Sequence, residues 1–347
     1  MGIFTATSRK RETYKVEIAQ SLLWECALGI AAVTNGRLLD TMETSKAEWG
    51  KLRNRLSDQL NDQLDLVQQN NTWKTLLQLL HQGDFHRLED FIEYIDRMDG
   101  RSLKFVAIPF LGDDLQDKRR KASEGHNEAI EHLKEVTRDN PFFPNYIEYI
   151  ANEDTGELKQ HLTEVMEKWY KEVVEPQADK LEGILERDAT AKVKNKTAMH
   201  PESFVEWATG GISYLPEPRV EKVLLIPHVT YRPWNVEADI EGSKVFYYPV
   251  SNESIHPGDA YTPSASLVQK HKALGDEVRL RIIKLLAEQD QSLQDLHGQL
   301  DAGKSTVHHH LKILRSCRLV EVDKGVYTLK RQALESLAGE LKDYIGW

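Results

Sequence analysis

The chain has 347 residues and a formal net charge of −10, and 40% of its residues are hydrophobic. This length suffices for the cores of two or three domains. No apolar run reaches the roughly 20 residues that span a bilayer, and no apolar stretch follows the charged residues 8–11, so the sequence predicts a cytoplasmic protein without membrane contact. Two cysteines, Cys26 and Cys317, exclude a framework of several disulfides and are expected to be buried.

The first two thirds of the chain have a helical pattern after one short strand. Residues 13–18 alternate between polar and apolar side chains, which predicts a half-buried strand. Ser21 is expected to cap the helix that follows. From there to about residue 210, apolar residues recur at helical spacing. Residues 158–185 are predicted to form one long amphipathic helix that bends at Pro176.

Beyond residue 210 the pattern becomes that of strands. Residues 220–229 and 244–250 are predicted strands, separated by a loop that contains Pro233 and Gly242. We expect them to form a small sheet with residues 13–18. Residues 251–264 have the composition of a linker. The sequence therefore predicts a mainly α (α+β) protein, with a helical region and a small sheet in residues 1–262 and a second domain in residues 263–347.

The second domain contains two short helices and a hairpin. Residues 293–300 have apolar side chains at helical spacing, a polar turn follows at 301–304, and Val307, Leu311 and Leu314 then mark one face of a second helix. Two helices joined by a tight turn form a helix-turn-helix. The runs 319–322 and 326–329 flank a turn with Gly325, which predicts a β-hairpin. This order is typical of a winged helix.

The second of these helices is basic within an acidic protein. Between Lys304 and Arg318 there are four Lys or Arg residues and no Asp or Glu. Residues 264–347 contain 13 Lys or Arg and 11 Asp or Glu, whereas residues 1–263 contain 32 and 44. A local reversal of charge on one helix indicates a polyanionic partner for that helix alone.

Two segments resemble a known family. Residues 272–286 (KALGDEVRLRIIKLL) are similar to the opening helix of ArsR-type (ArsR/SmtB-like) winged-helix transcriptional regulators, and residues 305–314 (STVHHHLKIL) resemble their recognition helix. The resemblance implies a regulator, more often a repressor, that binds double-stranded DNA as a homodimer with half-sites roughly 34 Å apart. The expected dimer surface consists of Leu267, Val268, Leu274, Leu334, Leu337, Leu341, Tyr344 and Ile345.

The helix-turn-helix position predicts which residues contact DNA. The start of the second helix enters the major groove, so the candidates for base contact are Lys304, Ser305, Thr306, His308 and His309. Side chains suited to phosphate contact are Lys312, Arg315, Lys324, Lys330 and Arg331. Only Lys324 is basic within the short hairpin turn. His310 has two interpretations, a DNA contact or a packed contact between helices.

No metal, cofactor or catalytic site is predicted. Residues 293–300 contain no Cys, residues 331–345 lack a His and carboxylate pair at ligand spacing, and the adjacent histidines 308–310 diverge by about 100° on a helix. No Gly-rich phosphate loop, HExxH run or nucleophile elbow is present. The basic run 118–121 is interpreted as a solvated helix start, with a second phosphate contact as the alternative.

These observations predict a non-enzymatic transcriptional regulator in which residues 1–262 sense an unknown effector or partner. The alternatives are a winged-helix module that binds another protein and an enzyme fused to a DNA-binding domain.

Overall fold

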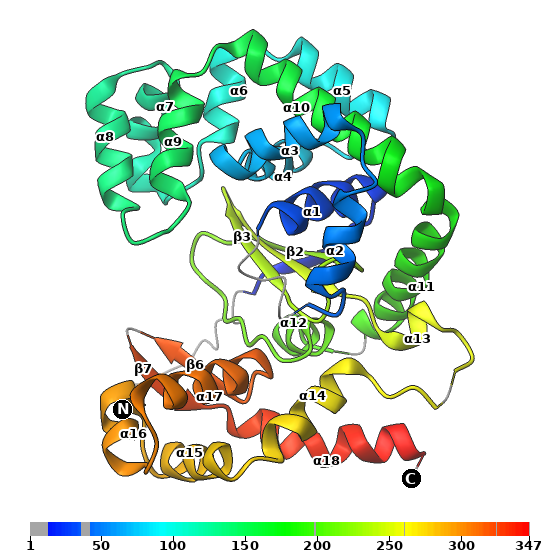
Figure 1. Ribbon diagram of the computed structural model, residues 1–347, viewed down its shortest axis with the longest axis vertical. Coiled ribbons are helices and arrows are strands. Elements are labelled where there is room, and N and C mark those ends of the chain that lie inside the picture. Colours follow the sequence, from blue (N-terminus) through cyan, green and yellow to red (C-terminus); the bar gives the residue numbers. More distant parts are fainter. Residues whose placement is uncertain (1–12, 36–41, 198, 260, 324, 347) are drawn as a thin grey trace, which may run out of the picture. The chain divides into compact units, whose positions relative to one another are not determined.

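The structure is a computed structural model that describes residues 13–35, 42–197, 199–259, 261–323 and 325–346 (Figure 1). The chain divides into two compact units. The first contains residues up to Val205 together with Ser213–Val250, and the second contains Glu206–Ile212 and Ser251–Trp347. The residues that the sequence suggested as a linker thus belong to the second unit. This unit also includes the short segment Glu206–Ile212, although Ser213–Val250, which follows it in the chain, belongs to the first unit.

The first unit contains one four-stranded sheet. Its strands are β1 (Lys15–Ile18), β2 (Lys222–His228), β3 (Val236–Ile240) and β4 (Ser243–Pro249), in the order β1-β2-β4-β3. Strands β1, β2 and β4 are parallel, and β3 runs antiparallel to β4. The three predicted strands therefore share a sheet, as expected. The prediction of a loop between them was wrong, because Pro233 and Gly242 lie on either side of β3 and mark its ends.

A wholly buried helix, α1 (Leu22–Thr34), lies at the centre of this unit. All 13 of its residues are buried, and the side chain of Ser21 accepts a hydrogen bond from the backbone N–H of Leu23 at its start, as predicted. The helix contacts α3, α4 and α10 as well as β2. Gly29 allows close contact with the indole of Trp169, which is 1% exposed. The core of the unit is thus built around one apolar helix.

Further helices cover α1 on the side away from the sheet (Figure 1). They and the remaining helices of the unit are α2 (Lys46–Arg53), α3 (Asp58–Asn70), α4 (Trp73–Leu80), α5 (Leu88–Arg97), α6 (Gly100–Ala107), α7 (Gln116–Ser123), α8 (Asn127–Val136), α9 (Phe143–Asn152), α10 (Thr155–Trp169) and α11 (Ala178–Lys196). Instead of one long helix at 158–185, a π-helical turn at Tyr170–Val174 and a 3₁₀ turn at Glu175–Gln177 separate α10 from α11. This interruption includes Pro176, which has no N–H to continue the helix. Helix α12 (Pro201–Thr209) begins in the first unit and ends in the second.

The second unit has the predicted winged-helix order. Its elements are α13 (Asn252–Ile255), α14 (Ala265–Leu274), α15 (Glu277–Glu288), β5 (Gln291–Ser292), α16 (Leu293–Gln299), α17 (Lys304–Ser316), β6 (Val320–Asp323), β7 (Val326–Leu329) and α18 (Arg331–Ile345). The strands form an antiparallel sheet in the order β5-β7-β6. Both cysteines of the chain are buried, as expected.

The single opening helix expected at 272–286 is in fact two helices. Helix α14 ends at Leu274, and Asp276 caps the start of α15 by accepting a hydrogen bond from the backbone N–H of Arg279 at 3.0 Å. Arg279 in turn donates to the carbonyl oxygens of Ala273 and Lys272, at 2.6 and 3.0 Å, where α14 ends. A cation at a helix C-terminus is favourable for the helix dipole. The two polar side chains therefore stabilise the corner.

The fold class predicted from the sequence, mainly helical with small sheets, is confirmed. Within the described ranges, no helix is both long and apolar enough to cross a bilayer.

Candidate nucleic-acid interface

Helix α17 is the second helix of the helix-turn-helix, and it differs from the first helix, α16, in how its start is capped. A capping box starts α16, because the Ser292 hydroxyl accepts from the Asp295 N–H while the Asp295 carboxylate accepts from the Ser292 N–H. Helix α17 begins at Lys304 after Gly303, which has no side chain to cap it. Its first N–H groups are therefore left for solvent or for an anion.

The apolar side of α17 packs into the core of the second unit. Val307, Leu311 and Leu314 are all 0% exposed. They belong to one buried apolar cluster with side chains of the neighbouring helices and strands, namely Ala273, Ile282, Leu286, Leu296, Leu300, Leu319, Val320, Tyr327 and Leu329. This packing decides which residues of α17 remain accessible.

The predicted contact residues that belong to α17 all lie on its exposed side. These exposed residues are Lys304, Ser305, Thr306, His308, His309, Lys312 and Arg315. The helix carries no Asp or Glu. Its exposed side therefore combines positive charge and hydrogen-bond donors without a carboxylate that would repel phosphate. Lys324, predicted to contact phosphate from the hairpin turn, lies outside the described residues.

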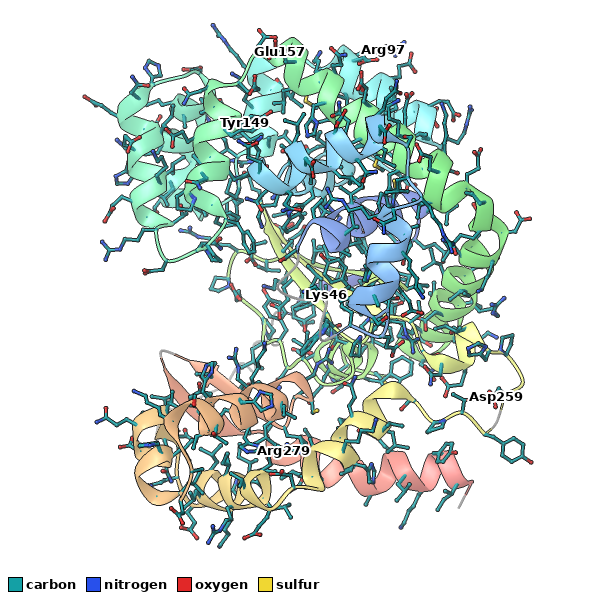
Figure 2. The ribbon with its side chains drawn as sticks, viewed as in Figure 1. Lys46, Arg97, Tyr149, Glu157, Asp259 and Arg279 are labelled. Carbon is teal, nitrogen blue, oxygen red and sulfur yellow. The ribbon has the colours of Figure 1, made fainter. Side chains whose placement is uncertain are left out.

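His310 lies on a different side of the helix, against the corner between α14 and α15. Its Nδ1 is 3.7 Å from Oδ1 of Asp276 and 3.4 Å from Nη1 of Arg279, which Figure 2 labels on α15. The backbone N–H of Arg279, and then the charges of Arg279 and His310, lower the pKa of the Asp276 carboxyl. Of the two interpretations of His310, the geometry favours a packed contact between helices.

Arg318 and Lys330 are engaged inside the second unit. Arg318 has a left-handed backbone conformation, with φ +58°, and its guanidinium donates to the carbonyl oxygen of Thr209 at the end of α12. The Lys330 ammonium donates to the carbonyl oxygen of Gly211 at 2.9 Å and lies 3.7 Å from Glu321. Phosphate contact by Lys330, which the sequence predicted, would therefore compete with these contacts and stays a prediction. Arg331 is exposed and donates to the carbonyl oxygen of Ala287.

Sequence reasoning missed the roles of Asp276 and Arg279, although a signal was present. An Asp immediately before a helical pattern is a common N-cap, and Arg279 follows it by three residues. Reading residues 272–286 as one helix concealed this cap. Within the part of the chain that the structure describes, no group of three or more His, Cys, Asp or Glu side chains is placed to hold a metal ion.

Comparison with known proteins identifies the helix-turn-helix. Residues 276–322 match the family model described as "Bacterial regulatory protein, arsR family". The chain is also 38% identical over 77 residues to a protein of Synechocystis sp. named "Transcriptional repressor SmtB homolog"; the match covers 21% of this chain and 58% of that protein's length. No solved structure matches the chain.

The segment that contains α15, α16, α17 and β6 is therefore an ArsR-type helix-turn-helix domain, in agreement with the resemblance seen in the sequence. The family model covers none of residues 1–275.

Proposed function

We propose that this protein is a sequence-specific transcriptional regulator that binds double-stranded DNA through α17 in the cytoplasm. The observation that carries the proposal is the exposed side of α17, which presents donors and positive charge and no carboxylate, on the second helix of an ArsR-type helix-turn-helix. We assign the chain no catalytic activity and no resident cofactor.

The position of each residue along α17 suggests its role. In helix-turn-helix proteins, residues near the start of the second helix contact base edges in the major groove. Lys304, Ser305, Thr306, His308 and His309 occupy that part of α17. Lys312 and Arg315 lie further along the exposed side and suit phosphate contacts, which position a protein without reading sequence. The uncapped start of α17 offers further N–H donors to a phosphate.

The active form in this proposal is a homodimer, since a dimer places two copies of α17 on neighbouring half-sites. Of the predicted dimer surface, Leu267 and Leu337 are buried within the unit itself. Leu341, Tyr344 and Ile345 at the end of α18 remain exposed and form the part that is available to a second copy. Light scattering on the full-length protein tests this point, and a monomeric mass at the concentrations used for DNA binding would contradict it.

In the same proposal the protein represses transcription, and the first unit senses an effector. Support for repression comes from the family resemblance and from the printed name of the Synechocystis relative. A first unit with its own core, larger than the DNA-binding unit, is suited to hold a regulatory site.

Fluorescence anisotropy tests the proposed function. The full-length protein is titrated into a labelled duplex from its own upstream region and into a scrambled duplex, over a series of salt concentrations. We expect the native duplex to bind more tightly. Its affinity should fall as the salt concentration rises, because cationic side chains that contact phosphates release counterions condensed on the DNA. Equal affinity for both duplexes at every salt concentration would refute sequence-specific regulation.

A further inference from the structure

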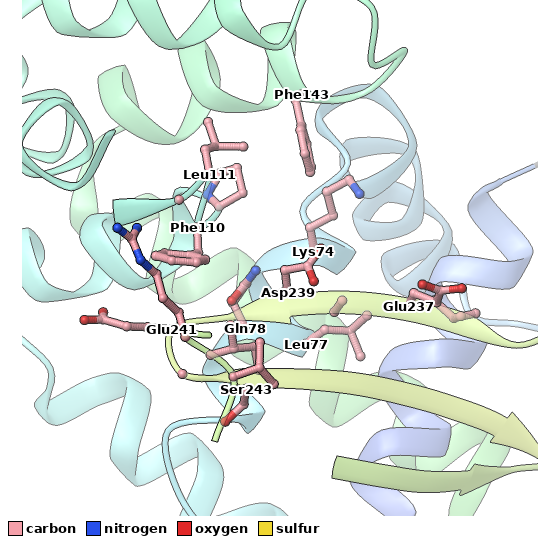
Figure 3. Close-up of a pocket in the computed structure, with 18 of the residues that line it drawn as sticks. Lys74, Leu77, Gln78, Phe110, Leu111, Phe143, Glu237, Asp239, Glu241 and Ser243 are labelled. Atoms are coloured by element: carbon pink, nitrogen blue, oxygen red, sulfur yellow. The ribbon is translucent and has the colours of Figure 1, made fainter. Parts of the chain in front are cut away.

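The first unit contains a cavity of about 760 Å³ beside its sheet (Figure 3). Side chains from α4, from the segment before α7, from the start of α9 and from β3 line it. Pockets that bind small molecules in proteins have volumes of about 300–1,000 Å³. The cavity is thus large enough for a small organic molecule.

Much of the cavity wall is apolar and aromatic. The side chains of this kind include Trp73, Leu77, Phe110, Leu111, Phe143 and Ile240. On α4, Lys74 and Gln78 lie one turn apart and both extend into the cavity from the same side of the helix (Figure 3). The wall therefore combines flat apolar surfaces with two hydrogen-bond donors that stand next to each other.

The Lys74 ammonium is surrounded by aromatic rings. Its Nζ lies 4.2 Å from the ring centroid of Trp73, 4.7 Å from that of Phe143 and 5.2 Å from that of Phe142. Among the described residues, none forms a hydrogen bond or an ion pair with this ammonium. Burial lowers the pKa of Lys74 to about 8. A partly desolvated cation without an anionic partner is costly, and ring faces compensate only in part.

Most other charged groups of the lining already have partners within the chain. The Lys244 ammonium lies 3.1 Å from Glu237 and 3.0 Å from Asp239. Asp113 pairs with Arg219, and the Gln116 amide donates to Glu241 at 2.8 Å. Four of the five carboxylates in the lining are thus engaged, and the fifth, Glu217, interacts with Tyr214. Arg219 is paired with Asp113, so Lys74 is the cation of the described lining that can pair with an anionic ligand.

The surroundings of Lys74 favour a carboxylate over a phosphate. Phosphate sites use several donors, commonly an arginine fork or a run of backbone N–H groups, to match a doubly charged group. Here a single ammonium and one neighbouring amide face flat apolar walls. One carboxylate on an aromatic or aliphatic body matches that combination, because the body covers the rings while the anion pairs with Lys74.

We propose that the cavity at Lys74 binds a small organic carboxylate with a flat apolar body, and that this ligand is the effector of the protein. The effector role rests on the proposed function, whereas binding of the carboxylate stands on the cavity alone.

Calorimetric titration of the full-length protein at pH 7 tests the binding. Three probes share one body and differ in charge: 2-naphthoate, 2-naphthamide and 2-naphthylmethylammonium. We expect 2-naphthoate to bind at least tenfold more tightly than the amide, because of the three probes only its carboxylate forms an ion pair with the Lys74 ammonium. The cationic probe is expected to bind most weakly. Tightest binding of the cation would show that the carboxylates dominate the cavity and would overturn the proposal.

Variants of one residue separate the charge from the cavity. Lys74→Met removes the charge and keeps most of the side-chain length. We therefore expect it to lose at least tenfold in 2-naphthoate affinity and to bind 2-naphthamide within twofold of the native protein. The retained amide binding also shows that the variant is folded. Lys74→Arg should keep the preference for the carboxylate. Lys180→Met changes an exposed lysine on α11 and should alter nothing. Unchanged 2-naphthoate affinity in Lys74→Met would refute the site.

The effector role has its own readout. Anisotropy with the upstream duplex is repeated with saturating 2-naphthoate, and we expect at least a threefold change in DNA affinity for the native protein and none for Lys74→Met. If the probe binds without any change in DNA affinity, the effector role is wrong and the binding site stands. If neither duplex is bound at all, the regulator proposal fails, while calorimetry still decides the site.

Discussion

Nδ1 of His310, on the proposed recognition helix, lies 3.7 Å from Oδ1 of Asp276, the residue that caps α15. Arg279 contacts the same imidazole and also holds the end of α14. One polar cluster therefore connects three helices of the second unit on the side of α17 that is turned away from its exposed donors. The cluster thus adds a polar contact between α17 and the corner of α14 and α15 to the apolar packing that leaves those donors exposed.

Loss of the Asp276 carboxyl should loosen this corner. We expect Asp276→Ala to lower local stability by about 1 kcal/mol, the usual value of an N-cap, so that amides of α15 exchange with deuterium about fivefold faster in the full-length protein at pH 7. Asp301→Ala, in the exposed turn before α17, serves as the control. Equal exchange in α15 for both variants would contradict the structural role of Asp276.

The contribution of the Asp276 carboxyl to the stability of α15 should depend on pH. The pKa of Asp276 is lowered in the folded protein, so its contribution to stability is complete above the unfolded pKa of about 3.9 and is lost as the pH falls through the folded value. The difference in α15 exchange between native protein and Asp276→Ala should therefore be constant from pH 7 to pH 5 and shrink toward pH 3. A difference that grows on acidification would have the wrong sign.

Lys312 and Arg315 should govern the salt dependence of DNA binding. Each phosphate contact contributes about 0.9 to the slope of log affinity against log salt concentration. We therefore expect Lys312→Ala and Arg315→Ala each to flatten the slope by about that amount and to weaken native and scrambled duplexes alike. Ser305→Ala and His309→Ala should instead alter the preference between duplexes. Identical behaviour of the two pairs would show that α17 is oriented differently on DNA.

Arg318 provides a contrast within the same basic segment. Arg318 is one of the four basic residues between positions 304 and 318. In the structure, however, its guanidinium donates to the Thr209 carbonyl within the second unit. Arg318→Met should therefore leave the salt slope of DNA binding unchanged within about 0.3, a fraction of one phosphate contact. Anisotropy over the same salt series measures this, and a loss of about 0.9 would reassign Arg318 to the DNA interface.

The sequence predicted elements whose signals are local. The pattern of Val307, Leu311 and Leu314 gave the exposed and buried sides of α17, because helical periodicity alone decides them. The sequence also placed the N-terminal strand in one sheet with β2 and β4, without its order. The sequence analysis failed where single residues mark the end of an element. Asp276 divides a helix that apolar periodicity continues, and Pro233 and Gly242 flank a strand where the sequence predicted one loop.

The cavity at Lys74 had no signal in the sequence. Lys74 follows Trp73 within an amphipathic helix, where a lysine normally faces solvent. Its environment arises only when α9 brings Phe142 and Phe143 beside α4 and β3 completes the wall. These contacts join segments that are distant in the chain, and periodicity cannot report them.

Gly29 should be required for the packing of the central helix. A Cβ at this position would lie 2.8 Å from Nε1 of the buried Trp169. Gly29→Ala gains up to about 1 kcal/mol of helix propensity but overpacks the core, which costs about 1–3 kcal/mol. We expect a lower thermal unfolding temperature for this variant. Gly50→Ala, on exposed α2 with no neighbouring atom within 4 Å, should raise it, and shifts in the same direction for both would contradict this account.

The affinity of the cavity for 2-naphthoate should fall as the pH rises through about 8. Burial lowers the pKa of Lys74 to about 8, so the ammonium that pairs with the anion is present at pH 6–7 and is lost above this value. The probe remains ionised throughout. We expect calorimetric affinity for 2-naphthoate to fall by about tenfold for each pH unit well above the pKa, until it approaches that of 2-naphthamide.

Other groups near Lys74 do not account for such a profile. The remaining charged side chains of the lining are carboxylates and Arg219. Burial raises the pKa values of Tyr146 and Tyr247, which moves both phenols further from pH 8. Affinity for 2-naphthamide should therefore stay constant with pH, and 2-naphthoate binding to Lys74→Met should lose its dependence. A midpoint near pH 8 that persists in Lys74→Met would assign the titration to another residue.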